Sequence, residues 1–208
     1  MKIAIINYGY GNLHSVAKAF EKANFDFNLN SNIEVTNNPS KIENADKIVL
    51  PGVGSFLDCS TAIKQIDGVY DAMQENIIHK KNKFMGICVG MQLLADIGYE
   101  NQECNGFGWL PGSVEKIQVS PEYKIPHMGW NEVNAIESPL FKGISNNSDF
   151  YFVHSYHFKT AKENIVASTI YSSEITAAVQ KDNIFGTQFH PEKSHNNGQL
   201  LIKNFIDW

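Results

Sequence analysis

One short stretch, in which a strand signal runs straight into a helix signal, constrains this chain most. Phe84 to Ile87 is an apolar run of the length typical of a buried strand, and Gly90 to Ala95 has the composition of a helix start. Cys88 stands at the junction, with a glycine two positions to either side. This G-x-C-x-G arrangement is the thiol form of the nucleophile elbow, a sharp strand-to-helix turn that exposes one reactive side chain. The stretch therefore predicts a cysteine nucleophile at a sheet edge.

The predicted turn also explains how the Cys88 thiol would be activated. A helix that begins at the cysteine aims its N-terminus at the sulfur, which favours the thiolate over the thiol. The alternative is that Cys88 is a buried cysteine acting as a small hydrophobic residue. The two glycines, the preceding strand and the following helix together favour the nucleophile.

The rest of the chain predicts an α/β fold. Strands are expected at residues 3–6, 25–29, 47–50, 84–87, 114–119, 132–135, 150–158, 165–171 and 177–188, the last containing a hairpin turn at 181–183. Helices are expected at residues 13–24, 56–65, 69–79, 90–95 and 197–208, with a short helix or turn at 40–45. Alternation in the first half indicates an open, mostly parallel sheet with helices on both faces, and the C-terminal half adds antiparallel strands. No repeat or linker interrupts the sequence, so we expect residues 1–208 to form a single domain.

Composition and charge exclude several classes of protein. The chain has 43% hydrophobic and 19% charged residues, an ordinary globular mixture. A net charge of −5 argues against nucleic acid as the main partner. The three cysteines are widely spaced and suggest neither a disulfide framework nor a metal site, so we expect no metal or cofactor and a reducing cytoplasm. The N-terminal apolar run is too short for a signal peptide, and no run reaches membrane-spanning length.

A nucleophilic cysteine needs a base, and the base needs an orienting group. Of the seven histidines, His190 has the best setting because Pro191 and Glu192 follow it. Extended residues i and i+2 point the same way, and proline keeps the preceding residue extended. Glu192 can therefore lie beside the imidazole and fix its tautomer. The alternative is a solvated strand end, which the elbow makes less favoured.

Acyl transfer also needs hydrogen-bond donors for the developing oxyanion. The backbone N–H of Val89, which follows the nucleophile, is the first candidate donor. The second is the N–H of Val53 in the sequence Pro51-Gly52-Val53-Gly54, which follows the predicted strand at 47–50. A purely structural turn is the alternative for this Gly-rich segment.

Three of these segments, GICVGMQ, PGVGSF and GTQFHPEKS, together resemble the class I glutamine amidotransferases. The segments PHMGWN (126–131), YFVHSY (151–156) and INYGYGN (6–12) resemble the glutaminase subunits of imidazole glycerol phosphate synthases within that family. The family usually has Asp where Asn7 stands and Leu where Val89 stands. Val89 still offers a backbone N–H, while Asn7 leaves open a paralogue that feeds ammonia to a different synthase.

The resemblance implies a function for these residues. Cys88 would attack the side-chain amide of L-glutamine, with His190 as base and Glu192 as its orienting group. The resemblance also implies that glutamine is held by Gly52, Gln92, Ser155 and Tyr156. Ammonia would pass to a (β/α)₈-barrel cyclase subunit that makes imidazole glycerol phosphate and aminoimidazole carboxamide ribotide, the partners forming a heterodimer. The candidate residues for the cyclase interface are Tyr8, Tyr10, Asn12, Met128, Trp130, Tyr151 and Lys193.

Structural alternatives and rival functions accompany these assignments. Gln92 could be an ordinary polar helix residue, and the interface aromatics could be packed in the core. A stand-alone cysteine hydrolase of γ-glutamyl or peptide bonds could use the same elbow without a partner. A non-catalytic binding module is the second rival, but the intact Cys88, His190 and Glu192 argue against it.

Overall fold

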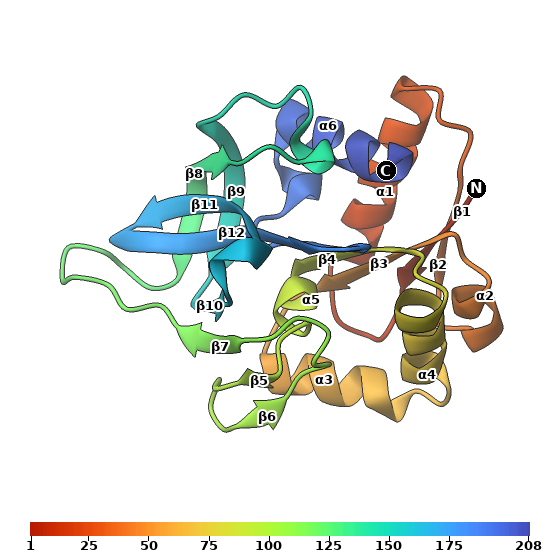
Figure 1. Ribbon diagram of the computed structural model, residues 1–208, viewed down its shortest axis with the longest axis horizontal. Helices are drawn as coiled ribbons and strands as arrows, with labels where there is room; N and C mark the ends of the chain where they lie inside the picture. Colours follow the sequence, from red (N-terminus) through yellow and green to blue (C-terminus); the bar gives the residue numbers. More distant parts are fainter.

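The computed structural model describes residues 1–208 and contains a nine-stranded sheet covered by helices on both faces (Figure 1). The strands of this sheet are β1 (Lys2–Ile6), β2 (Asn32–Thr36), β3 (Lys47–Gly52), β4 (Lys83–Cys88), β8 (His127–Ala135), β9 (Ser148–His154), β11 (Ile165–Tyr171), β12 (Ser173–Lys181) and β13 (Ile184–Thr187). They lie in the order β2-β1-β3-β4-β13-β12-β11-β8-β9. The first five strands in this order, from β2 to β13, run parallel to one another. Each of the last four, β12, β11, β8 and β9, pairs antiparallel with the strand before it. The predicted α/β fold is confirmed.

The helices divide between the two faces of the sheet. They are α1 (Leu13–Asp26), α2 (Pro39–Glu43), α3 (Phe56–Gln65), α4 (Val69–Gln74), α5 (Val89–Gln92) and α6 (His195–Asp207). Helices α1 and α6 lie side by side on one face, where the rings of Phe20 and Phe205 meet edge to face at 6.2 Å. Helices α3 and α4 lie on the other face (Figure 1). None of the helices combines the length and the apolar composition that a membrane span requires.

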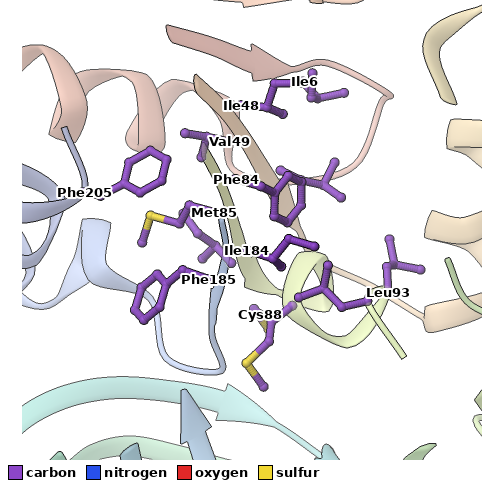
Figure 2. Close-up of a cluster of buried hydrophobic side chains, with 14 of the residues drawn as sticks. Ile6, Ile48, Val49, Phe84, Met85, Cys88, Leu93, Ile184, Phe185 and Phe205 are labelled. Carbon is purple, nitrogen blue, oxygen red and sulfur yellow. The ribbon is translucent and has the colours of Figure 1, made fainter. Parts of the chain in front are cut away.

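The central strands show why their sequences are continuously apolar. Met85 pairs with Phe185 and Phe84 pairs with Ile184 across β4 and β13. Successive strand residues point to opposite faces. Met85 and Phe185 therefore lie toward Phe205 of α6, whereas Phe84 and Ile184 lie on the other side of the sheet (Figure 2). Both faces of these strands are covered, so all four side chains are buried.

The predicted strand at 150–158 is two strands that belong to different sheets. Strand β9 ends at His154, and β10 (Tyr156–Lys159) joins a small second sheet. The other strands of that sheet are β5 (Ile97–Gly98), β6 (Cys104–Asn105) and β7 (Ser113–Lys116). The break falls at Ser155, where the ring of His154 bridges to the carbonyl oxygen of Tyr156 at 2.8 Å. The apolar pattern continues through Ser155 because residues on both sides of the break pack into the core.

The predicted strand at 25–29 is wrong. Helix α1 continues to Asp26, and the following strand, β2, begins only at Asn32. The helix ends where Asn28 adopts a left-handed conformation with φ of 55°. The side chain of Asn24 then bonds both the backbone N–H and the carbonyl oxygen of Ser31, which closes the connection. Alternation of aromatic and polar residues at a helix end mimicked a strand.

The register of three neighbouring parallel strands sets the position of the site. Gly52 at the end of β3 lies opposite Cys88 at the end of β4. On the other side, Ile87 of β4 lies opposite Thr187, the last residue of β13. The carboxyl ends of parallel strands form the edge at which α/β proteins place their ligands. The elbow, the Gly-rich segment and the segment carrying His190 therefore meet at this edge.

Candidate active site

The backbone of the elbow is strained and tightly packed. Cys88 has φ of 55° and ψ of −111°, a conformation that residues with a side chain rarely adopt. A Cβ atom on Gly86 would lie 2.4 Å from the carbonyl oxygen of Gly90, and one on Gly90 would lie 1.9 Å from that of Leu50. The two glycines therefore allow α5 to pass directly against β4 and β3. The predicted strand–turn–helix unit is present, and its turn leaves Cys88 at the rim of a cavity.

A buried histidine–carboxylate pair faces the same cavity. Nδ1 of His190 lies 2.8 Å from Oε1 of Glu192, and the two side chains are 3% and 1% exposed. The backbone N–H of His190 donates to the carbonyl oxygen of Tyr151, which anchors the segment to β9. Nδ1 of His190 keeps its proton because it donates to Glu192, so Nε2 is the ring nitrogen that gains and loses a proton. Nε2 is buried and has no hydrogen-bond partner other than the Cys88 thiol, which it faces.

The charge environment of His190 favours its imidazolium form. Burial by itself lowers the pKa of His190, but the neighbouring Cys88 and Glu192 raise it by more, to about 10. A negative sulfur and a negative carboxylate on opposite sides of one ring stabilise a positive charge on it. His190 can therefore hold a proton at neutral pH and deliver it to a group bound beside the sulfur.

The cavity beside Cys88 has a volume of about 320 Å³. Of the predicted site residues, it is lined by Cys88, His190, Val53, Val89, Gln92, Ser155 and Tyr156. Gly52 lies behind this wall: a Cβ on it would lie 2.7 Å from the N atom of Gly90 and 2.9 Å from the Tyr8 hydroxyl. Glu192 does not line the cavity itself, but it contacts His190, which does.

Glu100 is a lining residue that no sequence pattern indicated, and it is the one carboxylate in the cavity wall. Its Oε2 accepts a hydrogen bond of 2.7 Å from the backbone N–H of Phe56 at the start of α3. This contact holds the carboxylate against the cavity from a loop between β5 and β6. The residues around Glu100 do not distinguish it from a surface glutamate, so only its tertiary position indicates a role.

Gln92 holds one orientation in the cavity wall. Its Nε2 donates to the carbonyl oxygen of Tyr156 and to Oε1 of Gln188, both at 3.0 Å. Both hydrogens of the amide are therefore used within the protein. The amide oxygen of Gln92 makes no hydrogen bond within the chain and is the atom left to accept one from a ligand.

The segment that carries Val53 is anchored on both sides of this exposed residue. Tyr8 donates a hydrogen bond of 2.8 Å to the carbonyl oxygen of Pro51, and Gly52 packs closely against α5. Val53 is 39% exposed, and Gly54 has φ of 101°, with only the Tyr10 ring near the position of a Cβ. The thiol of Cys59 donates to the carbonyl oxygen of Val53 at 3.4 Å, so Val53 is held at the cavity, and Gly54 is the candidate hinge beside it.

The predicted interface residues form two groups. In the first, Met128 and Trp130 are 65% and 47% exposed, and Trp130 stacks on His195 at 4.9 Å. Tyr151 lies 6.0 Å from the Trp130 ring, and Nζ of Lys193 lies 5.6 Å from the Tyr151 ring. These residues make one aromatic surface with a cation at its edge.

The second group follows β1. Tyr8 is only 3% exposed, so it supports the surface from below, and Tyr10 stacks on it at 6.0 Å. The side chain of Asn12 accepts a hydrogen bond from the N–H of Ser15 and caps α1. Of this group, Tyr10 and Asn12 retain partly exposed surface.

Comparison with known proteins relates the whole chain to one family. The family model for glutamine amidotransferase class-I matches residues 4–208. The imidazole glycerol phosphate synthase subunit HisH of Pelagibacter ubique is 46% identical over 210 residues, and the alignment covers 100% of both chains. The subunit HisH 1 of Campylobacter jejuni (strain RM1221) is also 46% identical, over 98% of each chain.

Solved structures share the fold at much lower identity. A structure described as a glutamine amidotransferase has a TM-score of 0.73 at 14% identity, over 98% of this chain and 97% of its own. A glutamine amidotransferase from Thermotoga maritima has a TM-score of 0.61 at 18% identity, and the match covers 100% of this chain and 83% of that one.

The strain at Cys88 generates a prediction about stability. Cys88→Gly should be more stable than Cys88→Ala by about 1 kcal/mol, because glycine relieves a strain of about 1–3 kcal/mol while increasing the freedom of the unfolded chain. Urea unfolding of the two purified variants measures the difference. If Cys88→Ala were equally stable or more stable, the left-handed backbone at the elbow would carry no strain.

The pair formed by His190 and Glu192 generates a second prediction. Glu192→Gln removes the buried negative charge, so the pKa of His190 should fall from about 10 toward its ordinary value of 6.5. The imidazolium would then be lost at lower pH than in the natural chain. NMR titration of the His190 ring measures this shift, with the exposed Glu21→Gln as the matched control that should leave it in place. An unchanged His190 titration would mean that Glu192 does not stabilise the cation.

Proposed function

The chain belongs to the class I glutamine amidotransferase family, and from this premise we propose that it is the glutaminase subunit of an imidazole glycerol phosphate synthase. One observation carries the proposal: a strained elbow cysteine and a buried histidine–glutamate pair face one cavity in a chain that aligns over its full length with such subunits. We also propose that residues 1–208 act as one domain, because a single hydrophobic core joins both halves of the chain.

The first half-reaction is acyl transfer to sulfur. The Cys88 thiolate attacks the side-chain carbonyl carbon of L-glutamine, and the carbonyl oxygen becomes an oxyanion. When the tetrahedral intermediate collapses, the C–N bond breaks, and His190 gives its Nε2 proton to the leaving nitrogen. The products of this step are ammonia and a glutamyl thioester on Cys88. The raised pKa of His190 supports its role as the acid.

The second half-reaction is hydrolysis of the thioester. Neutral His190 takes a proton from water, whose oxygen attacks the thioester carbon. The C–S bond then breaks, which returns the Cys88 thiolate beside protonated His190 and releases glutamate. Glu192 keeps the ring oriented and stabilises its charge in both half-reactions. No metal or cofactor takes part in this scheme.

The cavity offers partners for each end of glutamine. The Glu100 carboxylate and the free amide oxygen of Gln92 suit the α-ammonium group, because both accept hydrogen bonds. Ser155 and Tyr156, in the segment that changes sheets, line the cavity beside Gln92 and can contact the amino-acid backbone of the substrate. Gly52 acts indirectly, since its lack of a Cβ lets β3 approach α5.

Two backbone N–H groups would stabilise the oxyanion. The N–H of Val89 lies at the start of α5, directly after the nucleophile. The N–H of Val53 would complete the pair when its segment turns toward the cavity, and the hinge at Gly54 supports such a movement. The usual cost of lacking one such donor is about 10² to 10³ in rate.

The ammonia released in the first half-reaction would pass to a (β/α)₈-barrel cyclase subunit. The aromatic surface of Trp130, Met128 and Tyr151, with Lys193 at its edge, has the composition typical of an interface core, and Tyr10 and Asn12 extend it. The reaction belongs in a reducing cytoplasm, where the thiol of Cys88 stays free.

The division of chemistry between two chains predicts the behaviour of Cys88→Ala. In a complex with the cyclase, this variant should lose glutamine-dependent synthesis by at least about 10⁴-fold, because the nucleophile is gone. Synthesis from added ammonium salt should be unchanged, because the acceptor chemistry lies on the other chain. Product formation from each nitrogen source measures both. Retention of more than a few per cent of glutaminase activity would exclude Cys88 as the nucleophile.

The placement of Val53 predicts that the chain is inactive until its partner binds. Glutamate release should be slow for the chain alone and rise at least about 10²-fold when a cyclase carrying its ribulotide ligand is added. Such a shift requires the partner to favour one state of the Val53 segment by about 3 to 4 kcal/mol. Full activity in the chain alone would contradict the gating and the synthase assignment, and would favour a stand-alone hydrolase.

A pair of glycine variants separates the gating from a general loss of stability. Gly54→Ala places a side chain at a φ of 101° beside Val53 and should reduce the activation. Gly68→Ala does the same at a φ of 70° before α4, outside the cavity lining, and should leave the activation unchanged. Equal activation in both variants would show that the Gly54 hinge is not used.

A further inference from the structure

We propose that Gln188 is a further catalytic residue, whose side-chain amide donates a hydrogen bond to the Cys88 sulfur and stabilises it as a thiolate. This inference rests on the proposed function for its role in turnover, but the contact itself is a property of the chain alone. Nε2 of Gln188 lies 3.6 Å from Sγ of Cys88, within hydrogen-bond reach of a sulfur acceptor.

The register of the sheet brings Gln188 to the nucleophile. Ile87 and Thr187 are opposite one another in the parallel strands β4 and β13, so the next residues of the two strands, Cys88 and Gln188, emerge side by side. The backbone N–H of Gln188 donates to the carbonyl oxygen of Ala177 at 2.8 Å, which fixes the segment beyond the end of β13. The Gln188 side chain is fully buried, so no water competes for its amide.

The neighbouring hydrogen bonds decide which end of the Gln188 amide faces the sulfur. Nε2 of Gln92 lies 3.0 Å from the carbonyl oxygen of Tyr156, and a carbonyl oxygen can only accept. That end of Gln92 must therefore be its NH₂ group. Its second hydrogen points to Gln188 at 3.0 Å, so the atom that receives it must be the amide oxygen. The remaining atom, the NH₂ group of Gln188, faces Cys88.

A second arm of the same network holds the Tyr156 carbonyl in place. Nδ1 of His154 donates to it at 2.8 Å, so Nε2 of His154 is an acceptor. Nδ1 of His127, at 2.9 Å, donates to that acceptor, and Nε2 of His127 in turn accepts from Nδ2 of Asn131 at 3.2 Å. Because the Tyr156 carbonyl oxygen can only accept, it fixes which ring nitrogen carries the proton in His154 and then in His127.

Both histidines of this arm stay neutral at ordinary pH. Burial lowers the pKa of His127 to about 4. Burial also lowers the pKa of His154, to about 3, although the Tyr156 carbonyl opposes the effect. Each ring therefore keeps one donor and one acceptor, and the network from Asn131 to Gln188 is unbroken.

A donor at this position has a specific chemical effect. A hydrogen bond to an anion is stronger than one to its neutral form, so the Gln188 amide favours the thiolate over the thiol. The flipped amide would present an oxygen to the sulfur and have the opposite effect. The network thus selects the orientation that activates Cys88, from the side opposite Gly52 of β3.

The test compares the reactivity of Cys88 in the natural chain and in Gln188→Met, which keeps the length of the side chain and removes its donor. Iodoacetamide labelling of Cys88 is followed by peptide mass spectrometry from about pH 5 to pH 10. The pH of half-maximal labelling should rise by about one unit, and the rate at neutral pH should fall about tenfold. The titratable groups around the sulfur are unchanged in this variant: His190, His154 and Glu100 in the cavity wall, and the nearby Tyr8 and Cys59.

Two controls accompany this measurement. Thr187→Val removes a buried hydroxyl whose hydrogen bond goes to the carbonyl oxygen of Phe189, and it should leave the Cys88 profile unchanged. The partly exposed Cys104 is an internal reference and should label identically in all variants. A folded Gln188→Met chain with an unchanged Cys88 profile would overturn the proposal.

A measurement on the natural chain covers the case in which Gln188→Met fails to fold. The side-chain NH₂ resonances of Gln188 should move with pH at the same midpoint as Cys88 labelling, whereas those of the exposed Gln102 should not. Constant Gln188 resonances across that midpoint would also overturn the proposal.

Turnover in the complex separates this inference from the proposed function. With the cyclase and its ligand present, Gln188→Met should lower kcat for glutamate release about tenfold, with little change in KM, because the donor acts on the nucleophile. If the natural complex released no glutamate, the proposed function would fail, while the labelling profiles would still decide the role of Gln188.

Discussion

The close passage of one backbone over another at the elbow is the constraint on which the site depends. Gly90 lies so near the Leu50 carbonyl that any side chain there would collide with it, and Gly86 lies equally tight against the start of α5. This packing holds Cys88 in a conformation that a side-chain-bearing residue does not choose by itself. The buried apolar strands β3, β4 and β13 supply the rigidity that sustains the strain, since their side chains are covered on both faces.

Around that rigid turn the protein arranges buried polar groups in hydrogen-bonded networks. The pair of His190 and Glu192 is almost fully enclosed, so its charges interact more strongly than they would in water. On the other side of the sulfur, Gln92 donates both amide hydrogens within the protein, and Gln188 donates one to the sulfur. Unpaired buried polar groups are costly, which makes each donor and acceptor depend on the next. The orientation of the groups at the sulfur is therefore a property of the whole cluster.

The rigid elbow contrasts with the adjustable parts beside it. Gly52 is locked between Tyr8 and α5, whereas a Cβ on Gly54 would make only ordinary contact with the Tyr10 ring, at a φ of 101°. The exposed Trp130 lies beside Asn131, the outermost residue of the network that ends at Cys88. Because successive strand residues point to opposite faces, the exposed aromatic surface lies on one face of β8 and the network on the other.

Local sequence by itself determined the elements whose cause is local. The glycine spacing around Cys88 requires a tight turn wherever the chain places it, and the short sequence His190-Pro191-Glu192 brings the carboxylate to the ring, through a 3₁₀ helix at Pro191–Lys193 and not through the extended chain that was expected. Only the tertiary structure decided what depends on register between distant segments. In the tertiary structure, α1 extends into residues 25–29, where a strand was expected, and the chain enters a second sheet after β9. It also brought Glu100 to the cavity and Gln188 to the sulfur, because contacts across such separations follow from strand pairing, which no short pattern encodes.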